Sequence, residues 1–141
     1  MIDDSEDLIK KVFNSDAKDT LAFGRFGIEK ESLRVSQSII SRKQHQESMG
    51  SPLCHRHITT DFSEAQLEFI TLPLTDKKMG LNFLENIHHY VSHKIKDEII
   101  WPFSMPPLIR SDHDIPIAYY GSSNLALFKA AYRKGLSYRY G

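Results

Sequence analysis

The chain has 141 residues, of which 40% are hydrophobic and 26% charged, and its 18 basic and 18 acidic residues give a net charge of zero. This length and composition are typical of a soluble globular domain with a core of its own. The balanced charge gives no electrostatic argument for a nucleic-acid or membrane partner. No apolar run approaches the roughly 20 residues that span a bilayer, and the N-terminus lacks a signal-peptide pattern. A single cysteine, Cys54, excludes an internal disulfide and favours a cytoplasmic protein.

The first half of the chain predicts one helix followed by strands. Residues 3–14 carry apolar side chains at helical spacing after acidic capping residues. Residues 23–35 predict a strand with glycines near its start. Residues 36–52 are polar and lack periodicity, so we expect a surface excursion. Residues 58–62 and 67–72 predict two strands, which are either joined by a tight bend or continuous.

The second half predicts two helices with a rigid connection between them. An apolar stripe predicts a long helix from residue 75 or 76 to about residue 98. Residues 99–107, IIWPFSMPP, contain three prolines and form either a buried connection or the wall of a pocket. A last helix is expected over residues 124–134 and should end at Gly135. These elements predict an α+β fold. The aromatic and basic C-terminus at Gly141 favours a single domain, residues 1–141, that is truncated there.

Carboxylates on the predicted strands are candidate metal ligands. Glu29 and Glu31 are two residues apart on one strand, which places them on one face, roughly 7 Å apart at the backbone. Glu68 lies in an apolar run, where a carboxylate is costly to bury unless a cation or several donors meet it. If the two strands are neighbours, the three acids converge, and Mg²⁺ prefers such oxygen ligands. Glu64 is a weaker candidate, because its direction depends on the bend.

A solvated strand face is the alternative for these acids. In that case the protein is a non-catalytic binding module whose acids pair with Arg25, Arg34 and Arg56. The sequence contains no Walker loop and no glycine-rich dinucleotide fingerprint. No side chain is assigned as a catalytic acid, base or nucleophile.

Other clusters give weaker signals. Cys54, His55 and His57 suggest a metal site, but no second ligand pair stands at a zinc-like spacing, so a polar strand is favoured. His89 and His93 are four residues apart on the long predicted helix, where solvent-facing histidines are favoured. On the last helix, Arg133 beside Tyr132 is either a carboxylate-binding group with an aromatic wall or an exposed arginine.

Five runs of the sequence carry a resemblance to one family. They are GIEKESLRV at 27–35, ITTDFSEAQLEFIT at 58–71, WPFSMP at 101–106, YGSSN at 120–124, and the matching positions within 128–141. In these runs the chain resembles the N-terminal part of the proteobacterial type of glutamate–cysteine ligase (γ-glutamylcysteine synthetase). The runs are ordered along nearly the whole chain and are jointly specific. Members of that family are much longer, which also favours a fragment.

The resemblance implies an ATP-dependent ligase built on a curved, mostly antiparallel sheet like that of glutamine synthetase. ATP would phosphorylate the γ-carboxylate of glutamate, and the amine of cysteine would attack the acyl phosphate. The products would be γ-glutamylcysteine, ADP and phosphate, which is the first step of glutathione biosynthesis. The implied small-molecule partners are glutamate, cysteine and ATP. The implied cofactor is Mg²⁺, held by Glu29, Glu31 and Glu68.

By the same resemblance, the cysteine pocket is formed by Phe62, Tyr132, Arg133 and Leu136. Apolar and aromatic walls suit the thiol side, and a guanidinium suits the carboxylate. Lys30 stands where the family more often has Arg, which keeps the charge but not the bidentate geometry. If the protein is only these residues, we expect little or no ligase activity, and the alternative function is an inactive binding module that keeps the fold.

Overall fold

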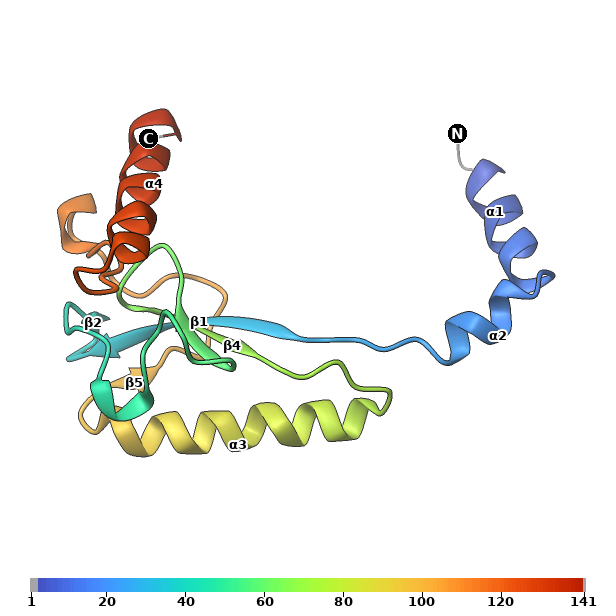
Figure 1. The fold of residues 1–141 in the computed structure, drawn as a ribbon, viewed down its shortest axis with the longest axis horizontal. Helices are drawn as coiled ribbons and strands as arrows, with labels where there is room; N and C mark the ends of the chain where they lie inside the picture. The colour runs from blue at the N-terminus through green and yellow to red at the C-terminus, as the bar shows by residue number, and fades with distance from the viewer. Residues whose placement is uncertain (1–2, 141) are drawn as a thin grey trace.

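The fold is an antiparallel sheet with a helix on each side, as Figure 1 shows. The computed structural model describes residues 3–140, and the side chains of residues 5–135. Helix α3 (Lys77–Ile95) runs along one face of the sheet, and helix α4 (Asn124–Tyr140) rises on the other side. The predicted α+β class is therefore confirmed.

Strand β1 lies between the other strands of the sheet. The strands are β1 (Glu29–Ser36), β2 (Ile39–Ile40), β3 (Ile58–Thr60), β4 (Gln66–Ile70) and β5 (Ile99–Ile100). Their order is β2–β1–β4–β3, with β5 also paired to β1, and each pair is antiparallel. The register of β1 and β4 sets Glu31 opposite Glu68 and Glu29 opposite Ile70. Opposed residues on neighbouring strands point to the same face, so this register decides which carboxylates meet.

The core lies between the sheet and α3. Ile58, Leu67 and Phe69 are almost completely buried on the sheet side. The helix contributes Leu84, Ile87, Val91 and Ile95. Burying each side chain of this size is worth about 1.5–3 kcal/mol, so this layer holds the sheet in place.

Helix α3 buries fewer of its apolar side chains than the sequence pattern predicts, and it is shorter than predicted. Of the two predicted starting positions, 75 and 76, the structure uses Asp76 as the cap, because its carboxylate accepts a hydrogen bond from the backbone N–H of Lys78 at 2.7 Å. Met79 and Tyr90 belong to the predicted stripe but are exposed. The helix ends at Ile95, and Lys96 then takes a φ of +51°, which turns the chain into β5.

A buried ion pair joins β1 to the end of α3. The Nη1 atom of Arg34 donates to both carboxylate oxygens of Glu98, at 2.9 and 3.0 Å, and both side chains are fully buried. Its Nη2 atom donates to the carbonyls of Lys43 and Glu64. The suggestion that Arg34 pairs with the strand acids is therefore wrong, because its charge is already neutralised in the core.

Several predicted boundaries differ from the structure. The predicted strand 23–35 begins only at Glu29, and before it the chain is extended with a single bridge between Phe26 and Leu74. The predicted excursion 36–52 contains β2 and the short helix η1 (Glu47–Met49), and Met49 packs into the core. Apolar side chains inside this polar stretch therefore anchor it to the body.

The two ends of the chain also depart from expectation. The first helix, α1 (Asp3–Phe13), is followed by an unpredicted α2 (Ala17–Ala22), and both stand away from the sheet in Figure 1. A short helix, η2 (Asp112–Asp114), precedes the segment that leads to α4. Helix α4 continues through Gly135, because a glycine favours a helix end without enforcing one.

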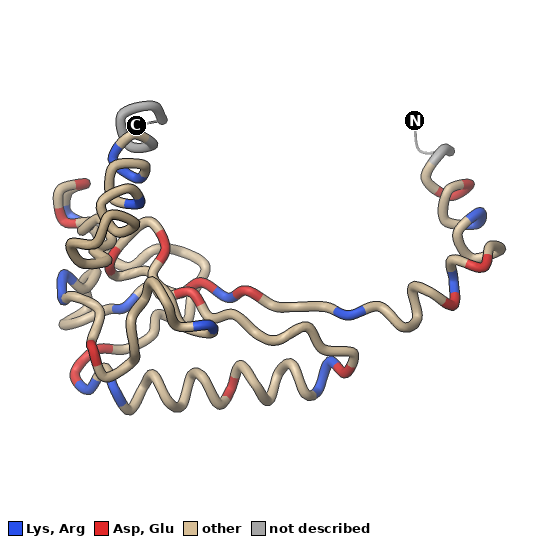
Figure 2. The backbone as a smooth tube through the Cα atoms, in the orientation of Figure 1, with Lys and Arg blue, Asp and Glu red and all other residues tan. Residues whose placement is uncertain are grey.

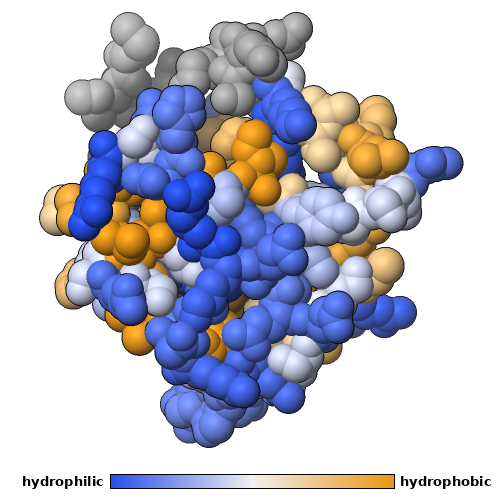
Figure 3. All heavy atoms as spheres, turned by 90° about the vertical axis from the view of Figure 1, so that its left-hand side faces the viewer, coloured by the Kyte–Doolittle hydropathy of each residue, from blue (hydrophilic) through white to orange (hydrophobic). Residues whose placement is uncertain are grey.

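Apolar side chains remain on the surface. In α4 the predicted stripe residues Leu125, Phe128 and Tyr132 are exposed, and Ala126 is buried instead. The end-on view in Figure 3 shows apolar side chains in separate patches among hydrophilic ones. Over the described residues, no helix is long and apolar enough to cross a bilayer.

Candidate functional site

Glu29, Glu31 and Glu68 lie on the sheet face opposite α3. Glu31 and Glu68 occupy one register position of β1 and β4, and Glu29 follows two residues along β1. Figure 2 shows the acidic segments of the two strands side by side. The prediction that the three glutamates share one face of the sheet is confirmed. Strand alternation places Glu29 and Glu31 on one face, and the antiparallel register places Glu68 opposite Glu31.

The surroundings of Glu68 disfavour its ionised form. Burial raises the pKa of Glu68, and the negative charges of Glu29, Asp61 and Glu31 raise that pKa further. The charge of Arg133 acts in the opposite direction on the pKa. Among the residues whose side chains are described, no lysine or arginine forms an ion pair with the three glutamates.

These acids fit a hard cation in chemistry but are not gathered into a coordination shell. Across the described part of the chain, no three His, Cys, Asp or Glu side chains lie close enough to hold a metal ion. The Glu31 carboxylate accepts a hydrogen bond from the Gln66 side-chain amide. A cation at this face would therefore draw oxygen ligands from side chains that share a face but stand apart.

Lys30 does not lie between the two acids that flank it in sequence. It points to the α3 side, opposite Phe69, with its Nζ atom 5.9 Å from the ring centre. Its ammonium group donates to the Ser32 hydroxyl, and burial lowers the pKa of Lys30. The positive charge of Lys30 therefore lies on the α3 side of the sheet, away from Glu29 and Glu31.

Arg133 reaches the acidic face from α4. Its Nη1 atom donates to Oδ1 of Asp61 at 3.1 Å, and its Nη2 atom donates to the Tyr120 hydroxyl at 2.9 Å. The guanidinium carbon lies 5.6 Å from the centre of the Tyr120 ring. The alternative of a simply exposed arginine is wrong, because only 14% of this side chain is accessible.

Two of the other predicted pocket residues, Phe62 and Tyr132, have described side chains. Phe62 follows Asp61 in the chain, is half-buried, and accepts a hydrogen bond from the Ala118 N–H at its carbonyl. Tyr132 precedes Arg133 in α4 but is 61% exposed. The side chain of Leu136 lies outside the part of the chain whose side chains are described. The structure thus brings Arg133 to the acids and leaves Tyr132 facing solvent.

The proline-rich segment walls a pocket, as one of its two interpretations predicts. A pocket of about 440 Å³ lies between this segment and the strands, with Glu31 and Gln66 in its lining. Phe103 and Met105 are exposed, so the segment is not a buried connection. The Trp101 indole N–H donates to the Met105 carbonyl at 2.6 Å, which closes the segment on itself.

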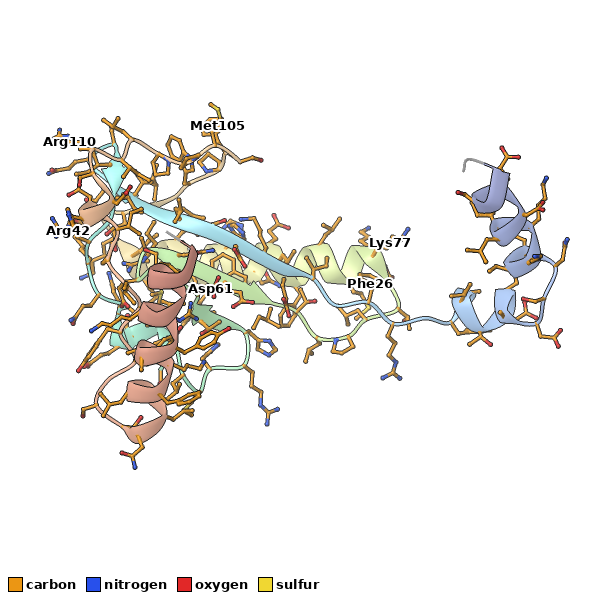
Figure 4. All side chains as sticks on the ribbon, turned by 90° about the horizontal axis from the view of Figure 1, so that it is seen from above. Phe26, Arg42, Asp61, Lys77, Met105 and Arg110 are labelled. Carbon is orange, nitrogen blue, oxygen red and sulfur yellow. The ribbon has the colours of Figure 1, made fainter. Side chains whose placement is uncertain are left out.

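The pocket and the arginine flank the acids from two sides. In Figure 4 Asp61 lies beside α4, whereas Met105 lies across β1 from it. The acidic face therefore has a guanidinium on one flank and an open, partly apolar pocket on the other.

The weaker metal candidates are not gathered into a possible metal site within the described part of the chain. Glu64 is 3% exposed, and its carboxylate accepts hydrogen bonds from the backbone N–H groups of His45 and Tyr119. The bend at residues 63–66 turns it away from Glu68, closed by a hydrogen bond from the Gln66 N–H to the Ser63 carbonyl. Cys54 is exposed and outside any described metal cluster.

The histidine candidates are engaged elsewhere. His55 Nδ1 accepts backbone N–H groups, and His57 Nδ1 contacts the Ile70 carbonyl. On α3, His93 Nδ1 contacts the His89 carbonyl, and the His89 ring stands near Glu85 at 3.9 Å. None of these four histidines belongs to a described group of three side chains that could hold a metal ion.

Sequence reasoning missed the roles of Asp61 and Tyr120. Asp61 is a visible acid in the strand run, but its partner Arg133 is 72 residues away. Tyr120 is 8% exposed, and its hydroxyl donates to the Thr60 carbonyl at 2.6 Å. Its place in the run YGSSN is the only signal that could have pointed to it.

Comparison with known proteins gives consistent matches. Residues 9–141 match the family described as glutamate-cysteine ligase. The glutamate–cysteine ligase of Alcanivorax borkumensis is 49% identical over 137 residues, covering 96% of this chain and 26% of that protein. The enzyme of Yersinia pseudotuberculosis is 50% identical over 118 residues, covering 83% and 23%. The chain thus spans about a quarter of the length of these relatives.

Solved structures share the fold. The glutamate–cysteine ligase of Francisella tularensis, solved in complex with AMP, aligns with a TM-score of 0.77 and 41% identity, covering 82% of this chain and 23% of that one. A bifunctional glutathione synthetase from Pasteurella multocida aligns with a TM-score of 0.73 and 35% identity, covering 86% and 16%.

Proposed function

The chain belongs to the glutamate–cysteine ligase family, and we propose that it contributes to the ATP-dependent joining of the γ-carboxylate of glutamate to the amine of cysteine. The observation that carries this proposal is the set of three glutamates on one sheet face with Arg133 on its flank. A relative solved with AMP supports a nucleotide co-substrate. The chain spans about a quarter of its relatives' length, so the proposal assigns it a cation-binding face and a cysteine-binding flank.

The proposed reaction has two steps. The γ-phosphoryl group of ATP passes to a γ-carboxylate oxygen of glutamate, and ADP leaves. The cysteine amine then attacks the acyl carbon, phosphate leaves, and the amine loses a proton. Phosphoryl transfer depends on charge neutralisation and positioning more than on covalent catalysis by the protein, which agrees with a site whose main groups are carboxylates and a guanidinium.

Glu29, Glu31 and Glu68 would hold Mg²⁺, which supplies positive charge against the phosphates when bound. The raised pKa of Glu68 supports this role, because burial and the charges of Glu29, Asp61 and Glu31 disfavour its ionised form and a bound cation would stabilise that form. Their separate positions on two strands suit a metal that is completed by nucleotide phosphates rather than enclosed by protein alone.

The cysteine flank would use Arg133 for the substrate carboxylate, with Phe62, Tyr132 and Leu136 toward the thiol side. A guanidinium binds a carboxylate through fixed, planar donors. Arg133 binds the carboxylate of Asp61 at 3.1 Å, which supports its capacity to hold a carboxylate.

A Mg²⁺ titration tests the cation face. We expect Glu29→Gln and Glu68→Gln each to weaken Mg²⁺ binding measured by calorimetry. Glu6→Gln is the matched control, because it removes the same charge from the separate α1 and should bind Mg²⁺ like the wild type. Unchanged Mg²⁺ affinity in both strand variants would remove the metal site from the proposal.

A further inference from the structure

We propose that Tyr120 and the buried Glu64 are positioning residues that hold Arg133 in place to bind the carboxylate of an amino-acid substrate. The identity of that substrate as cysteine rests on the proposed function above. The positioning of Arg133 rests on contacts in this structure alone.

Tyr120 fixes the guanidinium of Arg133 in two ways. Its hydroxyl accepts a hydrogen bond from Arg133 Nη2 at 2.9 Å while it donates to the Thr60 carbonyl at 2.6 Å. Its ring also lies beneath the guanidinium, with 5.6 Å between the guanidinium carbon and the ring centre. An arginine side chain has many rotamers, and a hydroxyl plus a ring face together select one orientation of its plane.

Tyr120 itself lies in a segment that has little regular structure. Residues 115–121 contain one isolated bridge, between Ile117 and Ser63, and Gly121 takes a φ of +94° as the chain turns toward α4. The position of the Tyr120 ring therefore depends on a few backbone hydrogen bonds to residues 62–64 and on side-chain contacts with this segment.

Glu64 supplies those contacts from the sheet side. One carboxylate oxygen accepts the backbone N–H of Tyr119, directly before Tyr120, and the other accepts the N–H of His45. The Glu64 backbone N–H donates to the Pro116 carbonyl at 2.8 Å, which ties the same segment a second time. A carboxylate that is 3% exposed needs such donors, so the segment and Glu64 hold each other.

The sheet in turn holds Glu64. Nη2 of Arg34 in β1 donates to the Glu64 carbonyl at 2.7 Å. A continuous set of contacts therefore runs from β1, which carries Glu29 and Glu31, through Glu64 and Tyr120 to Arg133. These contacts set the position of the Arg133 guanidinium relative to the acidic face. Removing one of them should therefore weaken carboxylate binding and leave Mg²⁺ binding by the three glutamates unchanged.

The ligand-free test measures hydrogen exchange of the Arg133 guanidinium protons by NMR on the 141-residue chain. We expect exchange to be about fivefold to tenfold faster in Tyr120→Phe and in Glu64→Gln, since each removes one hydrogen-bonding group of the set. Tyr119→Phe is the matched control, because its exposed ring lies outside these contacts. Val91→Ala is the stability control, since it removes buried side-chain volume from the core against α3 and touches none of these contacts. Each variant is measured at the same interval below its own melting temperature.

The outcomes distinguish a specific effect on the position of Arg133 from a general loss of protein stability. Wild-type exchange rates in both Tyr120→Phe and Glu64→Gln would overturn the inference. Equal acceleration in Glu64→Gln and Val91→Ala would also overturn the part assigned to Glu64. Acceleration in Tyr120→Phe and Glu64→Gln, with the two controls unchanged, would support it.

A cysteine titration of the same proteins tests the functional consequence. We expect the dissociation constant for cysteine to rise about fivefold to tenfold in Tyr120→Phe and Glu64→Gln, with Mg²⁺ affinity unchanged. If the wild-type chain does not bind cysteine but shows the expected exchange pattern, the cysteine assignment fails and the positioning stands. If cysteine binds equally well to all variants, the positioning role in substrate binding is overturned and the proposed function survives.

Discussion

Glu31 and Glu68 stand directly opposite each other on two neighbouring strands, so two like charges occupy one register position of the sheet. Such a pair destabilises a sheet unless its charge is relieved. This repulsion lowers the stability of the folded state, and its effect on the free energy of unfolding can be measured without any ligand.

The first prediction concerns pH. The folded-state pKa of Glu68 is raised, so between its ordinary value and its raised value the folded protein binds more protons than the unfolded chain. The contribution of Glu68 therefore makes the protein less stable as pH rises through that window, and it is fully unfavourable above it. We expect Glu68→Gln to increase the free energy of unfolding at pH 7 and to lose this advantage in acid.

Urea denaturation at several pH values measures this effect. Glu6→Gln on α1 again serves as the charge-matched control and should follow the wild type at each pH. A Glu68→Gln protein that is less stable than the wild type at pH 7 would contradict the repulsion described for this face.

The second prediction concerns the buried ion pair of Arg34 and Glu98. Glu98→Gln leaves the guanidinium charge without its counter-charge in the core, which should lower the free energy of unfolding by about 3–5 kcal/mol. The neighbouring Asp97→Asn removes only the exposed pair with Lys43 and should have little effect. Denaturant titration of the two variants compares a buried with an exposed charge one residue apart, and equal losses would be inconsistent with the buried pair.

The third prediction concerns the pocket wall. Trp101→Phe removes the indole N–H that donates to the Met105 carbonyl while keeping an aromatic ring beside Phe103. We expect faster proteolytic cleavage within residues 101–107 and little change in melting temperature, because this segment lies outside the core cluster. Tyr119→Phe offers a control for a conservative aromatic change elsewhere. Cleavage at the wild-type rate would show that the indole bond does not hold the wall.

The sequence predicts the acidic face because that feature is local in origin. Alternation alone places Glu29 and Glu31 together, and an apolar run marks Glu68 as unusual. The long helix α3 and its Asp76 cap follow from local periodicity in the same way. The Mg²⁺ and cysteine assignments stay predictions, since they depend on the family resemblance.

What the sequence does not predict depends on contacts between distant residues. The direction of Glu64 follows from the bend at 63–66 and from donors at His45 and Tyr119, which no local pattern places nearby. The pairing of Asp61 with Arg133 joins β3–β4 to α4 only after folding. In α4, local rules predicted a stop at Gly135 that the structure does not make.

The register of β1 and β4 has a consequence for folding itself. A slip of one residue would turn every side chain of β4 over, carrying Glu68 into the layer that holds Leu84 and Val91 and bringing Phe69 into water. Burying the Glu68 carboxylate against α3 would cost far more free energy than its repulsion with Glu31 in the native register. The carboxylate of Glu68, which we propose as a Mg²⁺ ligand, therefore also disfavours a misaligned pairing of the two strands while the chain folds.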